Sequence, residues 1–128
     1  MAGKITADLS GMTILITGAS SGIGAHFAEM TASRGAQVVV TARRRDKLEE
    51  LVADIAAKGG RAHAVTVDVT SATSIRDGVA AAVKAAGPIH ALINNSGVAP
   101  GRPLLGESAE DWDQVIATNL SGARHMAV

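Results

Sequence analysis

The chain has 128 residues, a formal net charge of zero, no cysteine and no tyrosine. The neutral balance offers no basic field to nucleic acid, and the four histidines have neither cysteines nor metal-ligand spacing near them, so the composition argues against nucleic-acid-binding and metal-binding proteins. No apolar run has the length of a signal-peptide core or a membrane-spanning helix, so we expect residues 1–128 to form a single cytoplasmic domain without a membrane partner.

The first predicted strand is an apolar run over residues 12–16, and a glycine-rich segment over residues 17–24 follows it. The spacing G-x-x-x-G-x-G lets the backbone turn sharply off a strand and presents free N–H groups at a helix start, where the helix dipole favours an anion. The hydroxyls of Ser20 and Ser21 add hydrogen-bond donors for a phosphate. We interpret the segment as a pyrophosphate cradle, although a plain tight turn would also use glycines. The missing Gly-Lys-Ser/Thr ending argues against a triphosphate-binding loop.

Strands and helices alternate along the rest of the chain. Helical periodicity and terminal glycines predict helices over residues 23–34, 46–58 and 71–86, and a last helix that begins at Ser108 with a capping-box-like Ser-x-x-Asp. Short apolar runs predict strands over residues 37–41, 62–67 and 89–93. Such strands suit a parallel sheet with helices on both faces. We therefore predict an α/β, Rossmann-like doubly wound parallel sheet with strand order 3-2-1-4.

This strand order places the turns at Gly18 and Asn94 on either side of the point where the winding reverses, so we expect a dinucleotide to lie between them. A carboxylate about 20 residues past the glycine segment would bind the ribose 2′-OH of NAD, but no acid stands there. The chain instead carries three consecutive arginines, and an arginine fork matches a 2′-phosphate. A solvated helix start is the alternative, although cations are poorly placed there. We predict NADP over NAD, with Arg43 as the main contact and Arg44 as a helper.

Four segments at the ends of the predicted strands and in the last helix resemble the short-chain dehydrogenase/reductase family. They are residues 17–24, the pair Asp68-Val69, the segment Asn94-Asn95-Ser96-Gly97, and Asn119. The resemblance covers the chain from about Met12 onward. It implies an oxidoreductase that transfers hydride between NADP(H) and a small-molecule carbonyl or alcohol substrate. It also implies homo-oligomers, either dimers or tetramers, built partly on the last helix.

The resemblance implies a role for each matching residue of the cofactor site. Asp68 would accept a hydrogen bond from the adenine amino group and Val69 would support the ring edge, although Asp68 also suits a turn or helix-entry acid before Thr70. Asn94 and Gly97 would lie against the cofactor ribose, with Ser96 between them where the family usually has alanine. The residues that would hold the pyrophosphate are Gly18, Ser20, Ser21, Gly22, Ile23 and Gly24.

Two asparagines have roles of another kind. The resemblance implies that Asn95 braces the neighbouring strands by side-chain to backbone hydrogen bonds, although residues 94–97 also suit a simple turn. Asn119 follows Trp112 and Val115 at helical spacing, so we expect its amide to be buried on their apolar face, where missing hydrogen bonds would cost about 1–3 kcal/mol. The resemblance implies that Asn119 is the catalytic asparagine that helps to hold a water in the proton relay. A purely structural asparagine is the alternative.

The catalytic serine and the Tyr-x-x-x-Lys of the resembled family have no counterpart in this sequence, which lacks tyrosine. We therefore expect the amino-terminal half of a longer reductase, inactive alone and binding cofactor weakly or not at all, with the fourth strand left as an exposed apolar edge. The alternative is a non-catalytic dinucleotide-binding or regulatory module. Residues 98–106, which include Leu104 and Leu105, either border a moderately apolar substrate or serve only as a connection.

Overall fold

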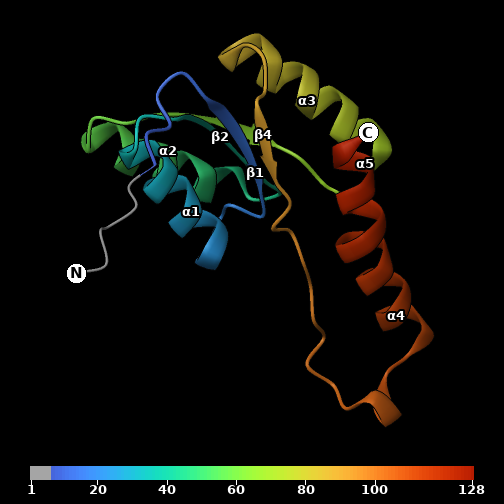
Figure 1. Cartoon of the computed structure of the whole chain (residues 1–128). Coiled ribbons are helices and arrows are strands. Elements are labelled where there is room, and N and C mark those ends of the chain that lie inside the picture. The colour runs from blue at the N-terminus through green and yellow to red at the C-terminus, as the bar shows by residue number, and fades with distance from the viewer. Residues whose placement is uncertain (1–6) are drawn as a thin grey trace.

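The computed structural model describes residues 7–128, which form a parallel sheet with helices on both faces (Figure 1). The strands are β1 (Thr13–Thr17), β2 (Gln37–Ala42), β3 (Arg61–Thr66) and β4 (Ala91–Ile93). The α-helices are α1 (Gly22–Ser33), α2 (Arg45–Ala57), α3 (Ala72–Ala86), α4 (Ala109–Val115) and α5 (Ala123–Ala127). A 3-10 turn, η1 (Leu104–Gly106), precedes α4, and a π-helical segment, η2 (Ile116–Gly122), joins α4 to α5.

The sheet has the order β3-β2-β1-β4, and every neighbouring pair is parallel. This order confirms the predicted doubly wound layout. Both β2 and β4 pair with β1, so the winding reverses beside β1, and the turns that follow β1 and β4 open at the same edge of the sheet. The reversal therefore sets the position at which a ligand crevice is expected.

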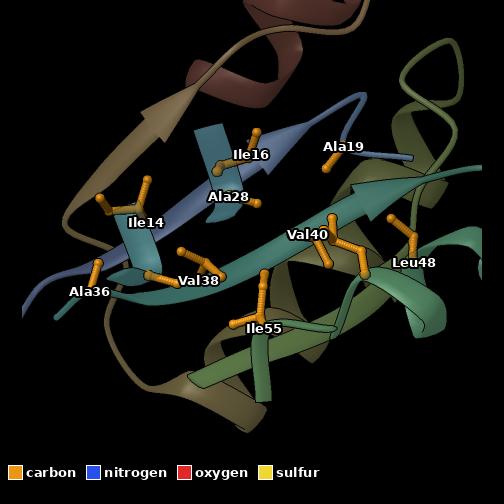
Figure 2. Close-up of a cluster of buried hydrophobic side chains, with 11 residues drawn as sticks. Ile14, Ile16, Ala19, Ala28, Ala36, Val38, Val40, Leu48 and Ile55 are labelled. Atoms are coloured by element: carbon orange, nitrogen blue, oxygen red, sulfur yellow. The ribbon is translucent and has the colours of Figure 1, made fainter. Parts of the chain in front are cut away.

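Alternate residues of the strands face two separate cores. Ile14 and Ile16 of β1 join Val38 and Val40 of β2 in one core, which α1 and α2 cover (Figure 2). Leu15 and Val39 point to the other face, where α3 and α5 cover them. Residues from the helices complete the cores: Ala28, Ala32, Leu48, Leu51 and Ile55 on the first face, and Ile75, Ala82 and Met126 on the second. Because both faces are buried, β1 and β2 read as nearly continuous apolar runs.

Most predicted boundaries agree with the structure to within one residue, but β4 begins at Ala91 rather than at residue 89. Just before this start, the side chain of His90 contacts the first residue of β1. Its Nδ1 accepts a hydrogen bond of 2.9 Å from the backbone N–H of Thr13. The backbone N–H of His90 in turn donates to the Thr13 carbonyl at 2.9 Å. A side chain therefore takes one of the bonds at the start of the β1–β4 ladder.

The last helix, predicted to begin at Ser108, is not α-helical along its whole length. The capping box at Ser108 is present, because its hydroxyl accepts a hydrogen bond from the N–H of Asp111 and the Asp111 carboxylate accepts one from the N–H of Ser108. Beyond α4, however, residues 116–122 wind as a π-helix before α5 resumes. The wider turn rotates the following side chains away from the positions that an α-helix would give them.

The segment between β4 and α4 runs away from the sheet before it returns through η1 and α4 (Figure 1). On the side away from β1, β4 pairs with no strand of residues 7–128, and its three residues are half-buried.

Within residues 7–128, no helix is long and apolar enough to cross a bilayer. The same residues contain no cluster of three or more His, Cys, Asp or Glu side chains able to hold a metal ion.

Candidate functional site

A cleft of about 760 Å³ opens where the turns after the four strands meet. Its lining brings together residues that are far apart in the sequence but follow neighbouring strands. The predicted cofactor residues that line it are Gly18, Ser20, Ser21, Arg43, Arg44, Asp68, Val69, Ser96 and Gly97. The cleft is therefore shared by all four strand ends, at the place where the strand order predicts a crevice.

The turns after β1 and β4 are tied together by Thr17 and Asn95. The Thr17 hydroxyl accepts hydrogen bonds of 3.0 Å from the backbone N–H groups of Asn95 and Ser96. The Asn95 side-chain amide donates to the carbonyls of Thr17 and Gly18, at 3.2 and 3.1 Å. These bonds confirm the bracing expected for Asn95. The contribution of the Thr17 hydroxyl was not predicted, because a threonine at a strand end has no distinctive sequence signal.

Two glycines of the turn after β1 leave no room for a side chain. Gly18 has φ +63°, and a Cβ there would lie 2.9 Å from the Cα of Ser96. A Cβ on Gly24 would lie 2.5 Å from both the Asn95 amide nitrogen and the Gly18 carbonyl oxygen. The first glycine therefore permits a left-handed turn, and the second permits α1 to pack closely against that turn.

The predicted pyrophosphate residues do not all line the cleft. Gly22 and Ile23, at the start of α1, are solvent-exposed, and Ile23 keeps 68% of its surface accessible. Gly24 is buried behind the turn. None of these three belongs to the cleft lining, whereas Gly18, Ser20 and Ser21 do. Ser21 is the N-cap residue of α1 but makes no side-chain cap bond, so its hydroxyl does not compete for the first N–H groups of that helix.

The three consecutive arginines separate into two environments. Arg43 and Arg44 line the cleft, and the Arg44 guanidinium donates to the Ser20 hydroxyl at 3.4 Å. Arg45, the first residue of α2, instead pairs with the Glu49 carboxylate at 2.7 Å. Arg43 and Arg44 are exposed, so both guanidinium groups have access to a bound anion.

Asp68 is held by Thr70. One carboxylate oxygen, Oδ1, accepts hydrogen bonds from the Thr70 hydroxyl at 2.6 Å and from the Thr70 N–H at 2.9 Å. These two bonds, the hydroxyl contribution first, lower the pKa of Asp68 below 3.8; burial opposes them in part, and the positive charge of Arg43 makes the smallest contribution to the lowering. Oδ1 of Asp68 therefore makes the hydrogen bonds expected of a turn residue. Asp68 also lines the cleft.

Only part of the predicted segment after β4 lines the cleft. Ser96 and Gly97 line the cleft together with Asn95, but Asn94 does not. The Asn94 side-chain amide instead donates to the carbonyl of Ala123, the first residue of α5, at 3.1 Å. Asn94 therefore anchors the last helix to the end of β4.

The predicted burial of Asn119 is wrong. Asn119 is exposed and does not line the cleft, and Trp112, on whose face it was expected, keeps 56% of its surface accessible. The physical reason is that the helical face carrying Trp112 is itself exposed, so helical spacing from Trp112 does not imply burial. Both polar atoms of the Asn119 amide are nonetheless satisfied: Oδ1 accepts from the Val98 N–H at 2.8 Å, and Nδ2 donates to the Val98 carbonyl at 3.0 Å.

Several lining residues were not predicted. Gln114 of α4 and Thr118 of η2 reach the cleft from the last helical region, facing the strand ends. Thr70 and Val98 each lie one residue beyond a predicted segment, and Ala42 and Val67 lie at the ends of predicted or observed strands. For Gln114 and Thr118 the sequence held no signal, because their place depends on how the last helical region crosses the sheet.

Comparisons with known proteins agree with this geometry. The model of the short chain dehydrogenase family matches residues 12–128. Gluconate 5-dehydrogenase of Gluconobacter oxydans is 40% identical over 127 residues, which cover 93% of this chain and 50% of that protein. The chain thus spans about half the length of the curated relatives it matches.

Two solved structures are similar in fold and differ in the cofactor bound. A metagenomic short-chain oxidoreductase in complex with NADP is 37% identical, with a TM-score of 0.85 over 94% of this chain and 55% of that one. A short-chain dehydrogenase/reductase from Burkholderia phymatum in complex with NAD is 35% identical, with a TM-score of 0.87 over 94% of this chain and 43% of that one. Both nicotinamide dinucleotides therefore occur among proteins that share this fold.

Proposed function

The chain belongs to the short-chain dehydrogenase family of NAD(P)-binding oxidoreductases, and from this premise we propose that it binds NADP(H) for a reaction on a carbonyl or alcohol substrate. The cleft at the four strand ends carries the proposal. A dinucleotide needs a turn whose backbone N–H groups and hydroxyls its pyrophosphate can approach, and Gly18, Ser20 and Ser21 line the cleft just before α1 begins. When bound, the cofactor would supply or accept the hydride.

The residues of the cleft fit the parts of NADP by their chemistry. The turn over residues 18–24 would hold the pyrophosphate through backbone N–H groups and the hydroxyls of Ser20 and Ser21. Asp68 and Val69 would meet the adenine, and Ser96 and Gly97 would lie along the ribose. Arg43 and Arg44 would pair with the 2′-phosphate.

Three features support NADP over NAD. Arg43 and Arg44 both line the cleft, and their guanidinium groups supply the positive charge that a 2′-phosphate needs. The hydrogen bond between Arg44 and Ser20 keeps one guanidinium beside the turn after β1. Finally, no lining residue at the end of β2 is acidic, so nothing there would accept a hydrogen bond from a free 2′-OH or repel a phosphate.

A titration of the 128-residue chain with two fragments of the cofactor tests this preference. The probes are 2′,5′-ADP, which carries the 2′-phosphate, and 5′-ADP, which lacks it, with binding followed by amide signals in ¹⁵N-resolved NMR spectra so that weak binding is measurable. We expect 2′,5′-ADP to bind more tightly. Arg43→Ala should weaken its binding about tenfold and leave 5′-ADP binding nearly unchanged, because a charge-assisted bond is lost.

Arg45→Ala is the matched control for this experiment. Arg45 neighbours the other two arginines, but it pairs with Glu49 and lies outside the cleft lining. Its removal should leave the selectivity for 2′,5′-ADP intact. An Arg43→Ala chain that keeps the full preference for 2′,5′-ADP would contradict the assignment of NADP.

We further propose that Asn119 serves catalysis and that the 128-residue chain alone does not turn over. Asn119 accepts a hydrogen bond from the Val98 N–H and donates one to the Val98 carbonyl, so it would serve catalysis by holding the segment after β4 in place. The sequence has no tyrosine, so the proton-transfer group that the family resemblance implies is not among these residues. NADPH oxidation should therefore be undetectable with a panel of aldehydes and ketones, and any steady turnover by the purified chain would overturn this part of the proposal.

A further inference from the structure

Asp68 is immobilised from two directions, although it lies in the connection between β3 and α3. Its backbone N–H donates to the Ser74 hydroxyl at 2.9 Å. The N–H of Ser74 donates in turn to the hydroxyl of Ser71, the N-cap residue of α3, at 3.2 Å. The first turn of a 15-residue helix thus fixes the backbone of Asp68.

Thr70 fixes the side chain. Its hydroxyl and its N–H both donate to Oδ1 of Asp68, at 2.6 and 2.9 Å, and these two donors set the orientation of the carboxylate plane. Among residues 7–128, no hydrogen bond to the second oxygen, Oδ2, is present. The hydroxyl proton of Thr70 is already donated to Asp68, although Thr70 itself lines the cleft. The pair therefore offers a ligand one oriented acceptor oxygen.

We propose that Thr70 is a positioning residue that orients Asp68 so that the cleft selects a 6-aminopurine dinucleotide over a 6-oxopurine dinucleotide. The inference rests on the proposed function. An ionised carboxylate accepts hydrogen bonds and donates none, so it attracts an exocyclic amino group and repels a carbonyl oxygen. A fixed carboxylate discriminates more strongly than a rotating one, because a rotating side chain could turn away from the carbonyl and must be ordered when the amino group binds.

The lowered pKa of Asp68 agrees with this role, because the carboxyl group stays ionised throughout the neutral range. Arg43 lines the same cleft and contributes to the lowering. An aspartate at its ordinary pKa would also be ionised at neutral pH, so Thr70 is expected to act through the orientation of Asp68, which does not require Thr70 to touch the purine.

The test compares NADP with nicotinamide hypoxanthine dinucleotide phosphate, which differs from it only in the purine ring. Binding to the 128-residue chain is measured by NMR titration for the wild type, Thr70→Val and Thr70→Ser. The wild type should prefer the adenine dinucleotide by about tenfold, a ratio typical of one charge-assisted hydrogen bond. Thr70→Val, which keeps the shape but loses the hydroxyl, should lose most of this preference, whereas Thr70→Ser should restore it.

Thr73→Val is the matched control, because Thr73 is an exposed threonine in the first turn of α3 and lies outside the cleft lining. Its purine preference should equal that of the wild type. Thr70→Ala replaces Thr70→Val if the latter does not give a folded spectrum. The ratio of 2′,5′-ADP to 5′-ADP affinity should be unchanged in every Thr70 variant, which separates an effect on the purine from general damage to the cleft.

The outcomes separate the two proposals. The proposed function requires this chain to bind NADP at least weakly, so a wild type that binds neither dinucleotide overturns that function, and this inference with it. A chain that binds both dinucleotides, with the same adenine preference in wild type and Thr70→Val, overturns the role of Thr70 and leaves the proposed function standing. A preference that Thr70→Val loses and Thr70→Ser does not restore also overturns the role, because shape rather than the hydroxyl would then be responsible.

Discussion

The side-chain amide of Asn95 donates a hydrogen bond of 3.1 Å to the carbonyl of Gly18, across a separation of 77 residues in the sequence. A residue in the turn after β4 therefore holds the turn after β1. The same nitrogen also donates to the Thr17 carbonyl, so both donor hydrogens of the amide have partners in that turn. The glycine turn consequently depends for its shape on a residue of the neighbouring strand end.

Replacing Asn95 by alanine should destabilise the fold. The change removes two hydrogen bonds to partly buried carbonyls, and each carbonyl then loses a partner, so we expect the free energy of unfolding to fall by about 1–3 kcal/mol. Urea denaturation followed by circular dichroism measures the loss. Asn94→Ala is the control, because Asn94 makes a single exposed bond to Ala123 and should cost clearly less. Equal losses in the two variants would show that the Asn95 bonds are not important.

Gly24→Ala should be poorly tolerated for a steric reason. The new methyl group would lie 2.5 Å from both the Asn95 amide and the Gly18 carbonyl, so α1 or the turn has to move. We expect a loss of about 1–3 kcal/mol in the free energy of unfolding, as for other overpacked positions. Gly106→Ala provides a control with open space around the added methyl group and should stay close to wild type in the same denaturation experiment. A stable Gly24→Ala chain would mean that the turn is looser than described.

Gln37→Glu should destabilise the sheet at the start of β2, at the end of the strands away from the cleft. The Gln37 amide nitrogen donates to the Ala86 carbonyl at 3.2 Å and lies 3.2 Å from Nε2 of His63. A carboxylate would place an acceptor against the Ala86 carbonyl, so we expect a loss of about 1–3 kcal/mol in unfolding free energy at neutral pH. Gln37→Met keeps the length without the charge and should lose less. Thermal unfolding of the two variants side by side decides whether repulsion or the missing bonds dominate.

The pKa of Asp68 should depend on Thr70. Because hydrogen bonds from Thr70 hold the folded-state pKa below 3.8, this carboxyl group stabilises the fold above pH 3.8, and the contribution is lost as the pH falls through the lower folded-state pKa. Thr70→Val should raise the pKa of Asp68 toward 3.8. It should therefore cost more stability at neutral pH than at a pH where the carboxyl group is protonated. NMR titration of the Asp68 side-chain carbon measures the shift, and an unchanged pKa in Thr70→Val would contradict the assigned cause.

The doubly wound sheet was predictable because its signals are local. Three consecutive valines in β2 and the glycines after α1 and α2 indicate the alternation of strands and helices without reference to distant residues. The winding of residues 116–122 was not predictable in this way. Apolar spacing is similar in an α-helix and a short π-helix, and buried residues of η2 such as Thr118 acquire their positions from packing against the rest of the fold.

The candidate site was predictable where one residue type carries the chemistry. Glycines at a strand end, and arginines in place of an acid, can be read from the sequence alone, and Gly18 and Arg43 do line one cleft. Thr17, Thr70 and Gln114 were missed for a different reason. A hydroxyl or amide with ordinary propensities gains its role only when distant strand ends meet, and the sequence does not record which partner it will find.

The cores on the two faces of the sheet differ in the span of sequence that supplies their residues. The buried residues of the core under α1 and α2 run from Ile14 to Ile55, with partly buried ones up to Ile93, whereas the buried residues of the opposite core run from Leu15 to Met126. Closing a longer loop costs more entropy, so the first core should form earlier during refolding. Pulsed hydrogen exchange should then protect the amides of β1 and β2 before those of α5, and simultaneous protection would contradict this order. Under partial denaturation, the chain should accordingly come apart first at α5, on the side of the sheet that its last residues cover.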